Sequence, residues 1–230
     1  MSKEKLDQYR GKLTPEQIAA GMNAAAQNSQ RLVADADALL KAGRYPSAAS
    51  LAILSIEESG KVSILRGLAL AKTAEQLKEA WKDYRSHRSK NFAWIMPDLV
   101  ARGARTLDQV LPTVDPYSEH PRVLDGVKQL GFYTDRLGDA NWSTPSEAIG
   151  KELAARLVGT AKALARAREI TPKEMELWIE HLGPVWKGPM AWMKTALLEW
   201  HSAMREAGIE VKGDMEAFVR GTSTSGPKEA

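Results

Sequence analysis

Apolar residues recur along the chain with helical spacing, and their arrangement is most distinctive between Tyr45 and Ala71. On a helical wheel at about 100° per residue, the apolar side chains of this stretch go most of the way round instead of keeping to one side. A helix of that kind is normally central and packed on several sides. The pattern therefore predicts one long central helix with the other helices arranged around it.

Three charged residues interrupt the apolar surface of this predicted helix: Glu57, Glu58 and Lys61. Burying an unpaired carboxylate or ammonium group costs several kcal/mol, so each of these groups needs a partner. Glu57 and Lys61 are one helical turn apart and can pair with each other. Glu58 then lacks a partner in its own helix, so we expect a basic side chain from another helix to meet it.

Capping signals place one long helix before the central helix and another after it. A capping box begins the first helix at Thr14, and Gly43 ends it. Because the turn to the central helix is very short, the two helices are expected to form an antiparallel hairpin. Thr73 begins the third helix, which we expect to continue to about residue 103 with a bend or interruption at Pro97.

The second half of the chain alternates between irregular segments and helices. Residues 104–121 contain three prolines and are expected to form a long connection. Threonine followed by proline at 144 and at 171 marks two further helix starts. The helices expected after the connection cover residues 122–131, 145–169, 172–182 and 190–208. No strand hairpin or internal repeat is recognisable, so the pattern predicts an all-α fold.

The composition of the two ends suggests the domain boundaries. Residues 1–12 are charged and are expected to form an N-terminal extension, followed by one all-helical domain over 13–212. Residues 213–230 have the composition of a linker and are expected to be a flexible tail. The Met and Trp residues before this tail recur near helical spacing, and we interpret them as core or interface.

Overall composition limits the class of protein. A chain of 230 residues with 43% apolar residues can bury one substantial core. A net charge of +3 and a pI near 9.0 permit RNA or another polyanion as partner without requiring one. The absence of cysteine excludes disulfides and suits a reducing cytoplasm. No apolar run approaches the roughly 20 residues of a membrane span, so we expect a cytoplasmic protein without membrane contact.

The third predicted helix has the densest group of polar residues. Asp83, His87 and Lys90 are spaced to share one face of a helix, and Asp83 is placed to hydrogen-bond His87. Because the central and third helices are expected to be antiparallel, Glu58 should lie at a depth similar to Arg85 and His87. We therefore predict that Glu58 is buried and contacts Arg85, His87 or Lys90.

The same residues also allow a purely structural interpretation. Glu57, Glu58, Lys61 and Arg85 can form a buried ion network that sets the helix register. The other histidines have no carboxylate or second histidine at metal-ligand spacing, so the sequence predicts no metal site and no cofactor. It also lacks glycine-rich phosphate-binding motifs and a G-x-S-x-G nucleophile elbow.

Three segments of the chain form recognisable motifs. They are A-x-x-L-x-x-x-G-R-Y-x-x-A-x-x-L-A-I-L-S-I-E-E-x-G-K at 36–61, W-K-D-Y-R-S-H-R-S-K at 81–90, and G-F-Y-T-D followed by W-S-T-P between 131 and 145. In this order they resemble the AbiV family of phage abortive-infection proteins. That family is in turn similar to the HEPN superfamily, whose members are compact helical bundles that dimerise and in many cases cut RNA without a metal.

The resemblance implies a polar site built from two parts of the chain, together with a homodimer. The implied site residues are Glu57, Glu58 and Lys61 on one side, Arg85, His87 and Lys90 on the other, and Tyr133 and Asp135 as a cap. In the HEPN ribonuclease signature four to six residues separate the arginine from the histidine. Here one residue separates Arg85 from His87, so ribonuclease activity is left open.

Two main functional hypotheses follow. In the first, the protein is a toxic effector that acts on RNA or translation, with His87 as general acid or base and Arg85 and Lys90 binding a phosphate. In the second, it is a non-catalytic interaction module that binds a phage or host component. A third and weaker hypothesis is a nucleotide-binding sensor. The partners considered are a second copy of the chain, RNA, a phage-encoded activator and a host translation component.

Overall fold

The computed structural model describes residues 7–111, 119–137, 141–165, 168–210 and 213–221. The helices in chain order are α1 Pro15–Lys41, α2 Tyr45–Ala69, α3 Ala74–Arg85, α4 His87–Lys90, the 3-10 helix η2 Phe92–Ile95, α5 Met96–Ala101, α6 Leu107–Val110, α7 Glu119–Phe132, α8 Pro145–Ala148, α9 Lys151–Leu164, α10 Pro172–Leu182, α11 Met190–Glu206 and α12 Met215–Arg220. Two short strands, β1 Asp135–Leu137 and β2 Asn141–Ser143, complete the described elements. The fold is all-α, as predicted.

The predicted helix starts at Thr14, Thr73 and Thr171 are confirmed, whereas the helix expected from residue 122 begins at Glu119. Thr14 and Gln17 form the capping box of α1, and the side chains of Thr73 and Thr171 accept backbone hydrogen bonds at the starts of α3 and α10. Gly43 ends the first helix with φ of 73°, a conformation that glycine adopts without strain. The α1–α2 hairpin is therefore specified by local sequence.

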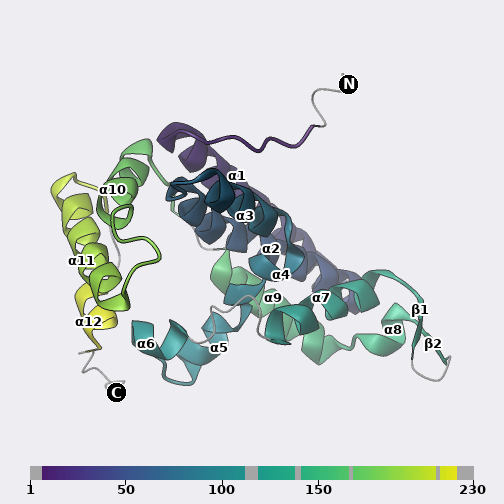
Figure 1. Cartoon of the computed structure of the whole chain (residues 1–230). Coiled ribbons are helices and arrows are strands. Elements are labelled where there is room, and N and C mark those ends of the chain that lie inside the picture. Colours follow the sequence, from purple (N-terminus) through teal and green to yellow (C-terminus); the bar gives the residue numbers. More distant parts are fainter. Residues whose placement is uncertain (1–6, 112–118, 138–140, 166–167, 211–212, 222–230) are drawn as a thin grey trace, which may run out of the picture.

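Helix α2 is the central element, as its apolar pattern predicts. It contacts α1, α3, α4, α7 and α9, and Figure 1 shows these helices grouped around it. Alanines and serines at its interface let α1 approach closely. The buried Ser29 and Ser55 exchange hydrogen bonds between the two helices, with each hydroxyl donating to the other residue's carbonyl at 2.9 and 2.8 Å. These bonds satisfy polar groups that would otherwise be costly to bury.

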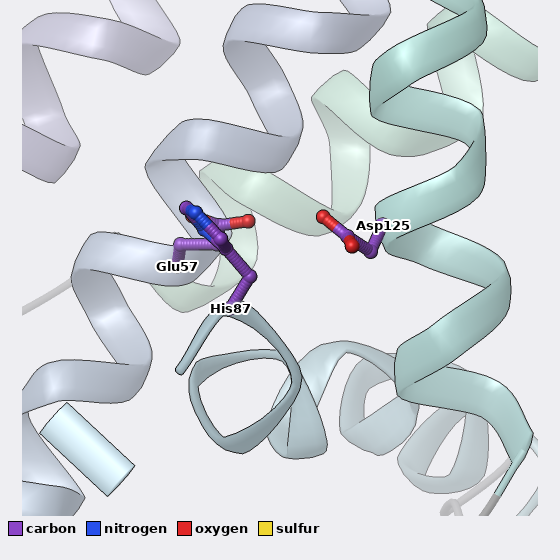
Figure 2. A group of neighbouring side chains, drawn as sticks. All are labelled: Glu57, His87 and Asp125. Carbon is purple, nitrogen blue, oxygen red and sulfur yellow. The ribbon is translucent and has the colours of Figure 1, made fainter. Parts of the chain in front are cut away.

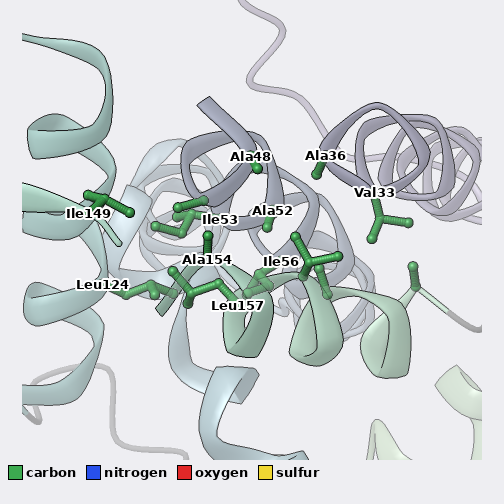
Figure 3. Close-up of a cluster of buried hydrophobic side chains, with 14 residues drawn as sticks. Val33, Ala36, Ala48, Ala52, Ile53, Ile56, Leu124, Ile149, Ala154 and Leu157 are labelled. Atoms are coloured by element: carbon green, nitrogen blue, oxygen red, sulfur yellow. The ribbon is translucent and has the colours of Figure 1, made fainter. Parts of the chain in front are cut away.

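Three clusters of buried apolar side chains hold the helices together. Figure 3 shows the first, in which Ile53 and Ile56 of α2 pack against Leu124 of α7 and Leu157 of α9. The second joins α1, α2, α3 and α10, and the third joins α10 and α11. Met175, Trp200 and Met204 are among the members of these last two, which places much of the Met- and Trp-rich segment in the core.

The third helix is shorter than predicted because it breaks at Ser86. This residue has extended backbone (φ −76°, ψ 126°), and its hydroxyl accepts a hydrogen bond from the backbone N–H of Ser89, which starts α4. Helix α4 then crosses α2 at Gly60, where a Cβ atom would collide with the carbonyl oxygen of Lys90. The close approach at Gly60 brings α4 onto the central helix.

Other departures from the predicted elements lie in the second half of the chain. The segment expected to lack strands contains an antiparallel pair in which Arg136 opposes Trp142. The helix expected over 145–169 is divided into α8 and α9. Helix α12 packs on α11 and α6, so its residues do not belong to a flexible tail as predicted, whereas 222–230 lie outside the described residues. Among the described helices, none is long and apolar enough to span a membrane.

Candidate functional site

Glu57 of α2 is the centre of a charged cluster that joins three helices. Its side chain is 4% exposed. One carboxylate oxygen, Oε1, accepts a hydrogen bond from Lys128 Nζ of α7 at 2.6 Å. The other, Oε2, lies 2.8 Å from His87 Nδ1 and 3.9 Å from Lys90 Nζ, both on α4. The central helix therefore does supply a buried carboxylate that basic groups of other helices meet.

That carboxylate is not the one predicted. Glu58 accepts a hydrogen bond from Lys61 at 2.6 Å within α2, and its side chain is 17% exposed. Lys61 also lies 5.4 Å from the ring centroid of Tyr84 on α3. The predicted contact between Glu58 and the third-helix cluster is thus wrong, and the predicted Glu57–Lys61 pair is replaced by Glu58–Lys61. Neighbouring residues differ by about 100° around a helix, which is enough to exchange their roles.

Lys128 and Asp125 of α7 were not identified by the sequence reasoning. Lys128 is buried, and its ammonium group lies 2.6 Å from Glu57 Oε1, 2.9 Å from Asp125 Oδ1 and 3.2 Å from His87 Nδ1. Burial alone would lower the pKa of Lys128, but hydrogen bonds to Glu57 and Asp125 outweigh it and raise the pKa. Lys128 is therefore a cation at neutral pH. Its only sequence signal was an Asp and a Lys one turn apart in a short predicted helix.

Glu57, His87 and Asp125 together present the kind of donor set that binds a metal ion. One ligand atom from each lies within 4.8 Å of the others, and Figure 2 shows the three side chains converging from α2, α4 and α7. However, the Lys128 ammonium group contacts all three. Because this cation already compensates the two carboxylates, we interpret the cluster as an ion network rather than a metal centre.

His87 is the most accessible member of the cluster, with a side chain that is 54% exposed. Its Nδ1 faces the buried Glu57 carboxylate, so a proton on Nδ1 is donated to Glu57 Oε2 at 2.8 Å. In that tautomer Nε2 is unprotonated and available to accept a proton. A carboxylate that orients an exposed imidazole is an arrangement suited to general acid–base catalysis.

Lys90 lies on the inner side of the same cluster. Burial lowers the pKa of its ammonium group, while the charge of Glu57 acts in the opposite direction. Its neighbour Arg88 is exposed and belongs to the same short helix. Of the cationic side chains on α4, Arg88 is therefore the one better placed to meet a ligand in solvent.

Asp83 does not make the predicted hydrogen bond to His87, and Arg85 does not make the predicted contact with Glu58. Arg85 donates hydrogen bonds to the carbonyl of Trp81 at 3.1 Å and to that of Tyr9 at 2.6 Å, and it stacks over the Trp81 ring. Asp83 accepts a hydrogen bond from the Ser89 hydroxyl at 3.0 Å rather than from His87. The break at Ser86 explains the absence of the Asp83–His87 bond, because the two residues no longer belong to one continuous helix.

These contacts predict that Arg85 anchors the segment before α1. Arg85→Ala should lower the free energy of unfolding by about 1 kcal/mol and speed trypsin cleavage at Arg10 and Lys12, while phage protection persists. Lys82→Ala, an exposed change on the same helix, is the control and should alter neither. Thermal melts and timed proteolysis measure the effects. Unchanged proteolysis of the Arg85 variant would contradict the anchoring role.

Tyr133 and Asp135 are exposed residues beyond the C-terminal end of α7. The Asp135 carboxylate accepts a hydrogen bond from the backbone N–H of Arg136 at 2.7 Å. Within the described ranges, neither residue hydrogen-bonds or ion-pairs with Glu57 or His87. Their predicted role as a cap is therefore not supported by a direct contact.

The structure is thus a helical hairpin surrounded by shorter helices, in which the buried carboxylate of Glu57 holds the exposed His87. A family model for HEPN_AbiV, described as AbiV, matches residues 17–166. This range is well over half of the chain and includes the whole charged cluster. The chain belongs to the AbiV family, and hence to the abortive-infection proteins of phage defence. The comparisons with curated proteins and with solved structures gave no match.

Proposed function

We propose that the protein is a toxic effector of phage defence that acts on RNA through His87 and the ion network beneath it. The observation that supports this most directly is the position of His87, which is exposed on one side and held by the buried Glu57 on the other. Lys128 in turn fixes Glu57. Groups held in this way need little reorganisation when charge develops during a reaction.

The proposed reaction is cleavage of an RNA phosphodiester by its own 2′-hydroxyl. His87 Nε2 takes the proton of the 2′-hydroxyl, whose oxygen attacks the adjacent phosphorus. The bond from phosphorus to the 5′-oxygen breaks, and the leaving 5′-oxygen takes a proton from water, which leaves a 2′,3′-cyclic phosphate and a 5′-hydroxyl end. Glu57 holds the imidazole of His87 in position, and the exposed Arg88 is placed to attract the phosphate.

Incubation of the purified protein with total RNA in EDTA, with and without a lysate of phage-infected cells, tests the proposal. We expect fragments with 5′-hydroxyl and 2′,3′-cyclic phosphate ends. Cleavage only after addition of the lysate would indicate a phage-encoded activator, and cleavage of ribosomal or transfer RNA would indicate a target in translation. Intact RNA under every condition would contradict the proposal.

The second candidate is a non-catalytic interaction module that binds a phage or host component. The placement of Arg85 favours it, because the arginine expected to bind phosphate instead contacts the segment before α1. The internal pairing of the buried charges around Glu57 is also compatible with a purely structural network. Under this hypothesis, phage protection does not depend on the imidazole of His87.

We also propose that the protein is a homodimer. Its similarity to HEPN domains supports this, as do large apolar side chains exposed on α5 and α7, namely Val100, Val123 and Phe132. Light scattering at tens of micromolar protein should give about twice the chain mass of 25.3 kDa, through an interface of at least about 1,000 Å². Val123→Glu should shift the mass toward the monomer. A monomer mass for the unsubstituted protein would contradict the proposal.

A further inference from the structure

A second site lies between the segment that matches the AbiV family, residues 17–166, and the helices that follow it. A cavity of about 570 Å³ is bounded by α2 and α3 on one side and by α10 and α11 on the other. This volume is in the range of pockets that hold small organic ligands. Helices α10 and α11 lie outside the segment that matches the AbiV family model, so the cavity depends on a part of the chain that the family match does not describe.

Most of the cavity wall is apolar and aromatic. Ile64 of α2 faces Trp178 of α10 and Met193 and Leu197 of α11, with Trp186 from the connection between the last two helices. Trp, Met and Leu side chains form a surface on which a flat apolar group can pack. The wall therefore favours an aromatic ligand over a sugar or a free phosphate.

The charged residues that line the cavity are two carboxylates, Glu79 and Asp83, and one ammonium group, Lys187. The two carboxylates are both on α3, but they differ in their partners. Glu79 forms an ion pair with Lys187 at 3.4 Å. Asp83 accepts a hydrogen bond from the Ser89 hydroxyl at 3.0 Å and has no ion pair among the residues that the structure places. A half-buried carboxylate without a cationic partner, beside an apolar wall, is best stabilised by a positive charge.

We propose that this pocket binds a small aromatic molecule with one protonated amine, its ring among Trp178, Trp186 and Met193 and its ammonium group against Asp83. The Ser89 hydroxyl holds the carboxylate in place. The proposal goes beyond the proposed action on RNA and does not depend on it.

Calorimetric titration of the full chain with three matched probes tests the proposal. These are 2-(2-naphthyl)ethylamine, the uncharged 2-(2-naphthyl)ethanol and the anionic 2-naphthylacetate. We expect the amine to bind at least about tenfold more tightly than the alcohol, which corresponds to about 1.4 kcal/mol, and the acetate to bind most weakly. Similar affinity for all three probes, or no binding of the amine at millimolar concentration, would overturn the proposal.

Two variants separate the role of Asp83 from that of the other carboxylate of the pocket. Asp83→Asn should remove the preference for the amine and leave the affinity for the alcohol unchanged. Glu79→Gln should keep the preference, because Glu79 is already paired with Lys187. Thermal melts establish that both variants are folded. A preference for the amine that survives Asp83→Asn would show that the ammonium group binds elsewhere and would refute the assignment.

Discussion

Glu57→Ala is expected to lower the free energy of unfolding by about 3–5 kcal/mol. The buried carboxylate is in contact with Lys128, His87 and Lys90. Its removal takes away the carboxylate that both buried ammonium groups share, while Asp125 still pairs with Lys128 and the charge of Glu58 still acts on Lys90. Because both lysines are nearly inaccessible to water, neither can recover its hydration without disturbing α4 or α7.

Glu58→Ala is the matched control for this experiment. Glu58 is adjacent in sequence and also charged, but it pairs with Lys61 and its side chain is 17% exposed, so we expect a loss of at most about 1 kcal/mol. Thermal and urea unfolding measure both variants, and each kcal/mol should correspond to about 2–4 °C in Tm for a chain of this size. Equal losses would show that Glu57 is not the centre of the network.

A second substitution can show whether the loss comes from Lys128. Lys128→Met in the Glu57→Ala background removes one of the two ammonium groups that have lost this carboxylate and replaces it with a side chain of similar length. We expect the double variant to be more stable than Glu57→Ala alone, since the cost of a buried charge that has lost Glu57 disappears. A double variant that is less stable, with a loss equal to the sum of both single losses, would contradict the proposed coupling.

His87→Ala is expected to lower the rate of RNA cleavage by about 10²- to 10⁴-fold and to abolish phage protection. Stability should change by no more than about 0.5 kcal/mol, because the side chain is half exposed and its loss leaves Glu57 paired with Lys128. Plaque assays and RNA cleavage assays measure function, and thermal melts measure stability. This combination separates a catalytic role from a structural one.

His181→Ala is a suitable control for His87→Ala. His181 lies on α10, where its Nδ1 is 3.9 Å from a carboxylate oxygen of Glu199, away from the charged cluster. We expect this variant to protect cells as well as the parent. If His87→Ala also protects as well as the parent, the ribonuclease proposal fails and the interaction module takes its place.

Local sequence was sufficient to predict α1, α2 and the start of α3, whereas α6 lies in the segment 104–121 that was expected to be an irregular connection. Proline and threonine at the start of a helix and glycine at its end act over one turn, so Thr14 and Gly43 mark the limits of α1 whatever surrounds it. The apolar pattern of α2 likewise predicts a central helix packed on several sides. The sequence also predicted that a buried charge in this helix needs partners from other helices. This follows because burying any unpaired charge costs free energy.

The tertiary structure decided which of the two glutamates is buried and which basic groups contact it. Both depend on contacts between distant parts of the chain. Nothing local distinguishes Glu57 from Glu58; the difference arises because α4 and α7 pack on the face of α2 that contains Glu57. The break at Ser86 is similar, since the surrounding residues are compatible with a continuous helix. It depends on the close approach of α4 to Gly60. Lys128 is 71 positions away from Glu57 in the sequence. Contacts over such separations are set by the packing of helices, which periodicity and capping signals do not encode.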